Sequence, residues 1–302
     1  MHKRSILSGS LLAVTMSCCS IAWGAESFCP GGSSPRPSII WCDDFEDSVP
    51  LGQKYFDYDN NGGDFVRLSG IGYNGSSGVQ VHWQTGEFDA GSLKRMFGRN
   101  PVFSQSHSGT DFGEIYWRLY VKHQVGWSGS PYKLSRALTM ASPNWAEGMM
   151  AHVWADGGNV LDLDPATGID ANGNLATTKY NDFQNLRWLG LTQGVTPLFQ
   201  DTSGKWYCIE AHARLNTLGQ ADGAFELWID NSLEASKGSL DWRSTWAGYG
   251  INAVFFENYW NGGAPGDRAR VFDNIVISTE RIGCISSDQT PPAAPTNLTI
   301  IQ

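Results

Sequence analysis

Four stretches of the chain carry polar and aromatic side chains at every second position, which an extended strand turns to one face. Guanidinium and imidazole groups can hold an anion, and phenol or imidazole groups can exchange a proton. Residues on one face of several strands can act on one ligand, so these positions are the first candidates for a site. They are Tyr116, Arg118, Tyr120 and Lys122 in YWRLYVKH (116–123), His152 and Trp154 in AHVW (151–154), Glu210, His212 and Arg214 in IEAHARLN (209–216), and Glu257 and Tyr259 in FFENYW (255–260), to which the expected loop SPYKLSRA (130–137) adds Lys133 and Arg136.

Each of these candidates also has a plain structural explanation. Arg118 is equally compatible with the exposed side of an edge strand, and Tyr259 with packing beneath a loop. A single histidine such as His152 is more often a hydrogen-bonded structural residue than a functional one. Alternation predicts which residues share a face, but it does not say which face of which sheet that is.

Strand signals run along most of the chain, and no segment has a strong helical pattern. Clusters of Gly, Asn, Asp and Pro separate the strand segments, as in DNNGGD (59–64) and NGGAPGD (261–267). The segment NWAEGMMAHVW (144–154) is compatible with a short helix, although Gly148 and Val153 disfavour it. Many strands without alternating helices predict an all-β sandwich of two sheets.

The first residues have the pattern of a secretory signal peptide, with a basic HKR start, an apolar run and small residues at the cleavage positions. Residues 1–24 are therefore expected to be removed, leaving a secreted or periplasmic protein. A lipid anchor on Cys18 or Cys19 is the alternative, disfavoured because the preceding VTMS is a poor lipobox. Residues 25–285 suit one large domain, and the proline-rich residues 286–302 are typical of a tail or a linker to a further module.

The charge balance limits the partners. The chain has 21 Lys and Arg against 30 Asp and Glu, a net charge of −9; loss of residues 1–24 removes Lys3 and Arg4 and gives 19 against 30, or −11. This argues against nucleic acid or an anionic membrane as the partner, and no further apolar run is long enough to cross a bilayer. We expect no membrane partner for the mature form, and we expect a monomer. An acidic ligand in a locally basic groove remains possible. The 13 Trp and 10 Tyr are suitable for a sugar-binding surface, although packing between sheets accounts for most of them.

Four cysteines remain after cleavage: Cys29, Cys42, Cys208 and Cys284. An even number in an exported chain predicts two disulfides, and four cysteines allow three pairings, which the sequence leaves open. Their scatter along the chain argues against a zinc site, which needs close pairs.

Three segments carry a resemblance to a known family: CDDFED (42–47), WYCIEAHARLNTLGQADGAFELWIDN (206–231) and FDNIVIST (272–279). Together they resemble concanavalin A-like jelly-roll proteins, and more narrowly the polysaccharide lyases of that fold that act on glucuronan and alginate, as well as a fungal cellulase-induced protein. The resemblance covers most of residues 39–284. It implies a jelly-roll sandwich of two antiparallel sheets with a groove along the concave one. The motifs Q-I-H and Y-K-x-G-x-Y of alginate lyases are missing, and His212 is an intruder in the hairpin pattern.

The resemblance also implies a structural calcium ion between the first and last strands. It assigns Glu46 and Asp273 as ligands, with Asp44 as a further candidate and backbone carbonyls completing the six to eight oxygens that calcium prefers. The plain alternative is that the acids of CDDFED are solvated and that Asp273 caps a turn.

For a lyase, the substrate would be an acidic polysaccharide. Elimination at a 4-linked uronate needs a group that neutralises the carboxylate, a base for the C5 proton and an acid for the leaving oxygen. Arg118 and His152 are the candidates for the carboxylate, Tyr259 is the candidate acid and base, and Lys133 and Arg136 are expected to contact neighbouring sugar acids. The remaining substrate-binding candidates are Tyr116, Tyr120, Trp154, Glu257, Glu210 and His212.

Two other functions stay open. A glycoside hydrolase needs two carboxylates across the scissile bond, for which Glu210 and Glu257 are candidates, but the E-x-D-x-E signature of β-glucanases is absent. A lectin-like protein would use the aromatic residues and the calcium ion without any chemistry. The hairpin pattern favours an outward polar face for Glu210, His212 and Arg214. We therefore expect the site on the strands of Arg118, His152 and Tyr259, with Glu210 and His212 as second-rank candidates.

Overall fold

The computed structural model describes residues 29, 37–103, 105–155 and 158–285. The expected signal peptide, Cys18, Cys19 and the proline-rich tail lie outside the described residues. One short α-helix, α1 (Leu51–Lys54), lies in the described part, where no helix is long and apolar enough to cross a membrane. The strands are β1 (Ile39–Asp43), β2 (Asp57–Asp59), β3 (Phe65–Leu68), β4 (Gly78–Trp83), β5 (Asp89–Met96), β6 (Glu114–His123), β7 (Lys133–Met140), β8 (Glu147–Trp154), β9 (Asp162–Thr167), β10 (Arg187–Trp188), β11 (Thr192–Gln193), β12 (Trp206–Arg214), β13 (Gly223–Ile229), β14 (Ser232–Leu240), β15 (Ala253–Tyr259) and β16 (Arg268–Ser278).

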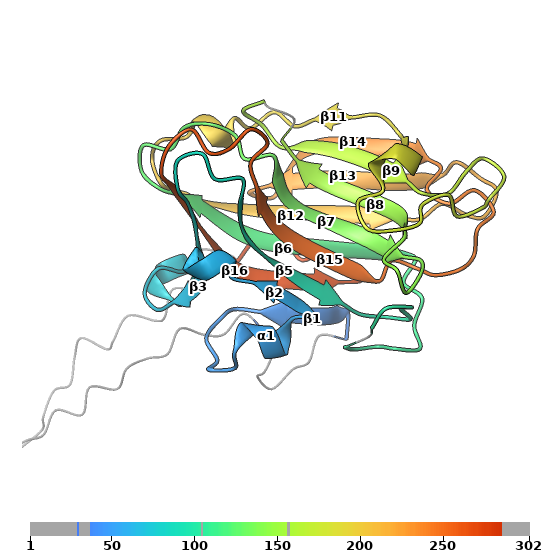
Figure 1. Ribbon diagram of the computed structural model, residues 1–302, viewed down its shortest axis with the longest axis horizontal. Helices are drawn as coiled ribbons and strands as arrows, with labels where there is room; N and C mark the ends of the chain where they lie inside the picture. The colour runs from blue at the N-terminus through green and yellow to red at the C-terminus, as the bar shows by residue number, and fades with distance from the viewer. Residues whose placement is uncertain (1–28, 30–36, 104, 156–157, 286–302) are drawn as a thin grey trace, which may run out of the picture.

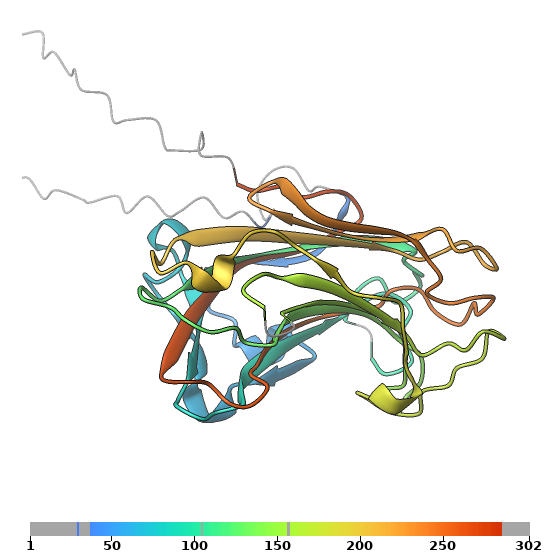
Figure 2. The same cartoon turned by 90° about the horizontal axis from the view of Figure 1, so that it is seen from above.

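These strands form two eight-stranded antiparallel sheets. Sheet A has the order β14-β13-β12-β6-β16-β4-β3, with β1 also paired to β16; sheet B has the order β10-β9-β8-β7-β15-β5-β2, with β11 paired to β9. Figure 2 shows the two sheets as stacked layers. The expected two-sheet jelly-roll sandwich is confirmed, and residues 144–154 supply strand β8 rather than a helix.

Alternation along the strands builds the core between the sheets. In β6, Ile115, Trp117, Leu119 and Val121 point into the core, so Tyr116, Arg118 and Tyr120 point outward from sheet A. In β15, Val254 and Phe256 enter the same core, and Phe255, Glu257 and Tyr259 therefore point outward from sheet B.

Lys133 begins strand β7 rather than lying in a loop, and a β-bulge follows it at once. Opposite β8, Lys133 pairs with Trp154 and Ser135 pairs with Val153, so β7 holds one extra residue. Leu134 lies in the core, and Ser135 also points inward, because its hydroxyl accepts a hydrogen bond of 3.0 Å from the Trp117 indole. The bulge thereby puts both Lys133 and Arg136, three residues apart, on the outer face of sheet B.

Two disulfides link the four cysteines of the described chain. Cys29 pairs with Cys42 beside the start of sheet A, and Cys208 of β12 pairs with Cys284. The predicted number is confirmed, and the structure supplies the pairing.

Candidate functional site

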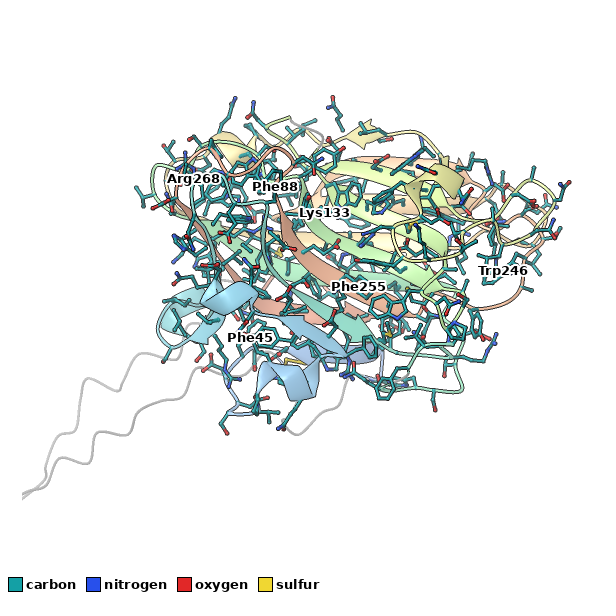
Figure 3. The ribbon with its side chains drawn as sticks, viewed as in Figure 1. Phe45, Phe88, Lys133, Trp246, Phe255 and Arg268 are labelled. Atoms are coloured by element: carbon teal, nitrogen blue, oxygen red, sulfur yellow. A yellow bond between two sulfur atoms is a disulfide. The ribbon has the colours of Figure 1, made fainter. Side chains whose placement is uncertain are left out.

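The outer face of sheet B, here called the site face, is built from side chains of β5, β15, β7, β8 and β9. At one end of these strands the face is apolar and covered by loop side chains. Its buried residues there are Met96, Ala253, Leu138, Met150 and Ala166, and the partly buried residues that pack on them are Phe56, Val102, Trp145, Tyr180 and Leu186. The polar candidates occupy the rest of the face. Figure 3 places Lys133, Phe88 and Phe255 on the sheet turned toward the viewer.

Arg136 is the centre of a buried charged cluster. Its guanidinium is fully buried and contacts Glu257 at 2.9 Å and Glu147 at 3.5 Å. The Tyr180 hydroxyl also contacts the guanidinium and donates a hydrogen bond of 3.2 Å to Glu257. Burial acts to lower the pKa of Arg136, but Glu257, Tyr180 and Glu147 together outweigh it and the net pKa is raised. Arg136 is therefore a charge-paired structural cation that joins β7, β8 and β15, and its full burial closes it to a sugar.

The two acids of this cluster differ. Burial acts to raise the pKa of Glu257, but Arg136 and Lys133 outweigh it, so the net pKa is lowered and Glu257 is ionised at neutral pH. In Glu147 burial wins over Arg136 and raises the pKa to about 7. Glu147 reaches the site face through a second bulge, at the β7–β8 pairing near Met140, and alternation therefore could not identify it.

His152 lies on the same face but is completely covered. Its ring contacts Trp154 at 3.8 Å and Trp188 at 5.8 Å between centroids. Nδ1 lies 2.8 Å from the Asp164 carbonyl oxygen, which can only accept, so Nδ1 carries the hydrogen. Burial and, less strongly, the charge of Arg136 hold the pKa of His152 well below its usual value, so the ring is neutral. Within the described chain, Nε2 has no hydrogen-bond partner.

Lys133 and Tyr259 are the polar pair that stays open. They are opposite each other in the β7–β15 register, and both are half-buried. The Lys133 Nζ lies 4.9 Å from the centroid of the Tyr259 ring and 5.4 Å from that of Trp154. Burial lowers the pKa of Lys133, and Glu257 opposes that shift without cancelling it. An ammonium and a phenol thus share an accessible place above ionised Glu257.

Exposed aromatic rings continue from this pair in both directions. Phe88, 49% exposed, lies 6.4 Å from Tyr259. On the other side, Phe183 and Trp188 are 40% and 44% exposed and stack on each other at 6.3 Å; Phe183 also lies 6.5 Å from Trp154. This row, here called the aromatic line, comprises Phe88, Tyr259, Trp154, Phe183 and Trp188. Phe183 and Trp188 were not among the predicted residues, because Phe183 lies in a three-residue 3-10 turn and Trp188 in the two-residue strand β10, and neither is long enough to give a periodic signal.

Arg118 does not join this site, which corrects its expected role beside His152. It belongs to β6 of sheet A and is fully buried on the outer side of that sheet. Its guanidinium donates to the carbonyls of Gly283, at 2.9 Å, and Asn274, at 3.2 Å. The hydrophobic core separates it from His152, so the two cannot hold one carboxylate.

Tyr120 and Glu210 fix the same chain segment, residues 282–285, over sheet A. The Tyr120 hydroxyl accepts a hydrogen bond of 2.7 Å from the Ile285 amide. The Glu210 carboxylate accepts those of Ile282 and Gly283 at 2.6 and 3.0 Å. Glu210 and Glu257 therefore lie on different sheets, which contradicts the pairing that a hydrolase would need.

Tyr116 and His212 also lie on the outer face of sheet A. Their rings stack at 4.3 Å, and the two imidazole nitrogens contact Glu226 and Glu114 at 2.8 and 2.7 Å. Of the predicted residues, the structure thus brings Lys133, Arg136, His152, Trp154, Glu257 and Tyr259 together on sheet B, and it places Tyr116, Arg118, Tyr120, Glu210 and His212 on sheet A.

Two of the expected calcium ligands meet at one turn, residues 73–77. Asp273 Oδ2 accepts hydrogen bonds from the Tyr73 amide at 2.7 Å and the Ser76 hydroxyl at 2.9 Å, and Glu46 accepts one from the Ser77 amide at 2.6 Å. Burial raises the pKa of Asp273 to about 7, and nearby Glu46 adds to the shift. Asp44 accepts a hydrogen bond of 3.3 Å from the Glu46 amide. The described residues contain no cluster of three or more acidic, histidine or cysteine ligands, so carbonyl oxygens would have to complete a calcium shell.

No protein-family model and no curated protein matches this chain by sequence. Solved structures do match. A glucuronan lyase from the fungus Trichoderma reesei has a TM-score of 0.55 at 13% identity over 80% of this chain and 96% of its own. An alginate lyase from a Chlorella virus gives 0.55 at 13% identity over 80% and 100%, and one from Aplysia kurodai gives 0.51 at 15% identity over 80% and 100%. At these identities the likeness shows the fold alone: the chain has the jelly-roll sandwich that these polysaccharide lyases share.

Proposed function

We propose that the protein is a polysaccharide lyase that cleaves a uronate-containing polymer by β-elimination at the site face. The observation that carries this is the open pair of Lys133 and Tyr259, with the Lys133 Nζ 4.9 Å from the phenol ring. The pair has the two group types that elimination requires, a cation for the carboxylate and a proton-exchanging group. The fold shared with glucuronan and alginate lyases supports the choice of substrate.

In the proposed reaction, the Lys133 ammonium pairs with the uronate carboxylate, so Lys133 takes the part that the sequence suggested for Arg118. Tyr259, in its deprotonated form, acts as the base and removes the C5 proton. The released electron pair forms the C4–C5 double bond, and the C4–oxygen bond breaks. The Tyr259 phenol then gives its proton to the leaving oxygen, which restores the phenolate.

The aromatic line would hold the polymer across the strands. Sugar rings present apolar C–H faces that stack on aromatic rings, and Phe88 and Trp188 offer exposed rings on opposite sides of Lys133. Ionised Glu257 is buried on the same face and is paired with Arg136. It would therefore orient Lys133 by charge rather than touch the sugar.

The decisive experiment offers the protein alginate and glucuronan and records the ultraviolet absorbance of the unsaturated product. Elimination alone creates that double bond, so its appearance supports the lyase. New reducing ends without the absorbance would indicate a hydrolase. Retention on immobilised polysaccharide without either would indicate a lectin-like protein, the alternative that the exposed aromatic line also favours.

A structural calcium ion and secretion complete the proposal. The carboxylates of Glu46 and Asp273 beside turn 73–77 fit calcium, because the two meet there and no cation among the described residues offsets the burial of Asp273. Glu46 and Asp273 would hold the ion, with Asp44 nearby. Two disulfides support a place outside the cytoplasm.

A further inference from the structure

Arg270 is a buried cation that the proposed reaction does not use. It belongs to β16 of sheet A, is 1% exposed, and points across the core toward sheet B. Burial alone lowers the pKa of Arg270 to about 9, and no acidic side chain in the described part of the chain compensates its charge. The rings of Trp83 and Phe272 lie within 5.0 Å of its guanidinium carbon. Burial of a charge without an acidic partner destabilises the folded state, so the hydrogen bonds of Arg270 must offset that loss.

Those contacts go to the backbone directly beneath Lys133 and Tyr259. Arg270 Nη2 donates to the carbonyl oxygens of Lys133 at 3.1 Å and Glu257 at 2.9 Å. Nη2 and Nε both reach the Asn258 amide oxygen, at 2.6 and 3.0 Å. Asn258 in turn donates 2.8 Å to the carbonyl of Gly91. One guanidinium and one amide thus join β7, β15 and β5.

The sheet is irregular at this level. Between β15 and β5 the register shifts between Glu257 and Tyr259, and between β15 and β7 it shifts between Phe256 and Tyr259. The β7 bulge after Lys133 adds a third irregularity beside them. Bulges interrupt the ladder and leave backbone carbonyls in need of donors. Arg270 and Asn258 supply those donors from the core side.

We propose that Arg270 and Asn258 are positioning residues that hold these bulges in the one register that sets Lys133 opposite Tyr259. Neither touches the substrate, because both act from the core side of sheet B. The inference rests on the proposed function for its catalytic part, but the bracing of the bulges is a property of the fold and is measurable without substrate.

The test compares Arg270→Lys with Arg95→Lys. Lysine is a single donor group that cannot span the three acceptors, and burial also disfavours its charged form. Arg95 is the matched control: it is 7% exposed, lies in β5, and bonds the Lys54 carbonyl away from the bulges. For Arg270→Lys we expect kcat to fall about 10- to 100-fold with KM little changed, because a misplaced catalytic pair loses rate while the binding face persists. Amide hydrogen exchange at residues 133–135 and 257–259 should also accelerate. Arg95→Lys should change neither.

Asn258→Asp tests the Gly91 contact, because it keeps an acceptor for Arg270 and replaces the donor to Gly91 by a carboxylate oxygen, while its negative charge pairs with Arg270. We expect a smaller fall in kcat than for Arg270→Lys, with faster exchange confined to the β5–β15 bulge. Unchanged kcat in Arg270→Lys alongside faster exchange would overturn the positioning role, and unchanged exchange would overturn the brace. If the wild-type protein eliminates no polyuronate, the proposed function fails, and the exchange measurement still decides whether the brace exists.

Discussion

The outer faces of the two sheets carry the same kinds of residue but differ in what lies on them. On sheet A, Arg118, Tyr120 and Glu210 are saturated by backbone groups of residues 282–285, which the Cys208–Cys284 disulfide ties to β12. On sheet B, no backbone segment of the described residues is bonded over the side chains of Lys133 and Tyr259, which stay half-buried. Arginine, glutamate and tyrosine at alternate positions therefore indicate a face that is either exposed to solvent or covered by another segment of the chain. Whether such a segment binds them decides whether they are available to a ligand or serve the fold.

The largest effect on the elimination rate is expected from Tyr259, when its loss is compared with that of a tyrosine on sheet A. Tyr259→Phe removes one hydroxyl from the site face and should lower kcat/KM on a polyuronate about 100- to 10,000-fold, the range for loss of a general acid–base group. Tyr116→Phe removes the same hydroxyl from the face of sheet A and should leave the rate unchanged. Equal rates for both variants in the absorbance assay would remove Tyr259 from the proposed mechanism.

A second experiment releases residues 282–285 from sheet A by removing the disulfide that ties them to β12. Replacing Cys208 and Cys284 by alanine should lower the free energy of unfolding by about 2–4 kcal/mol, since the bond closes a separation of 76 residues. Removing the Cys29–Cys42 bond, with a separation of 13, should cost about 1.5 kcal/mol less in the chain-entropy model. Denaturant unfolding measures both. The elimination rate below the unfolding transition should not change, and a large loss of rate in the Cys208 and Cys284 variant would show that sheet A also serves the reaction.

The sequence predicted which side chains of one strand share a face, but it did not predict to which sheet each strand belongs. Alternation correctly grouped Tyr116, Arg118 and Tyr120, because a strand of ten residues repeats strictly every second position. It could not place Arg118 apart from His152, since the order of strands depends on long-range pairing that no local pattern encodes. The three motifs identified the fold because they occur at the paired terminal strands and one hairpin.

Bulges account for the rest of what the sequence missed. Lys133 and Arg136, three residues apart, should face opposite sides of a regular strand, and the extra residue in β7 brings them to one face. Glu147 joins Arg136 through the same kind of irregularity. Bulges depend on donors elsewhere in the fold, such as the Arg270 guanidinium 137 residues along the chain from Lys133, so local periodicity does not reveal them.

The proposed calcium ion at Glu46 and Asp273 predicts that the stability of the protein depends on calcium. Saturating calcium should raise the free energy of unfolding by about 2.7 kcal/mol at a hundredfold excess over its Kd, because it binds only the folded state. Asp273→Asn should abolish that increase. Asp47→Asn is the control, because Asp47 is 49% exposed at its side chain and pairs with Lys54 and Arg67, surface ion pairs worth about 0–1 kcal/mol each, besides accepting the Val49 amide. Thermal unfolding with calcium and with a chelator gives the readout, and identical melting of the wild-type protein in both would refute the ion.

The pH dependence of the elimination rate tests the charge of Lys133, and the shift expected between the wild-type protein and Lys133→Arg is modest. Burial lowers the pKa of Lys133, and the proposed role needs its ammonium form, which exists below that pKa. Activity should therefore fall on the alkaline side, at a pH below the usual lysine value of about 10.4. Lys133→Arg keeps the positive charge at every accessible pH, so it should retain activity, with a modest loss from altered geometry, and extend it to higher pH. Lys133→Met should be inactive at every pH. If Lys133 instead acted as a neutral base, Lys133→Arg would be as inactive as Lys133→Met and wild-type activity would rise through the Lys133 pKa. The activity of Lys133→Arg relative to that of Lys133→Met thus decides between a cation and a base at Lys133, the half-buried lysine opposite Tyr259.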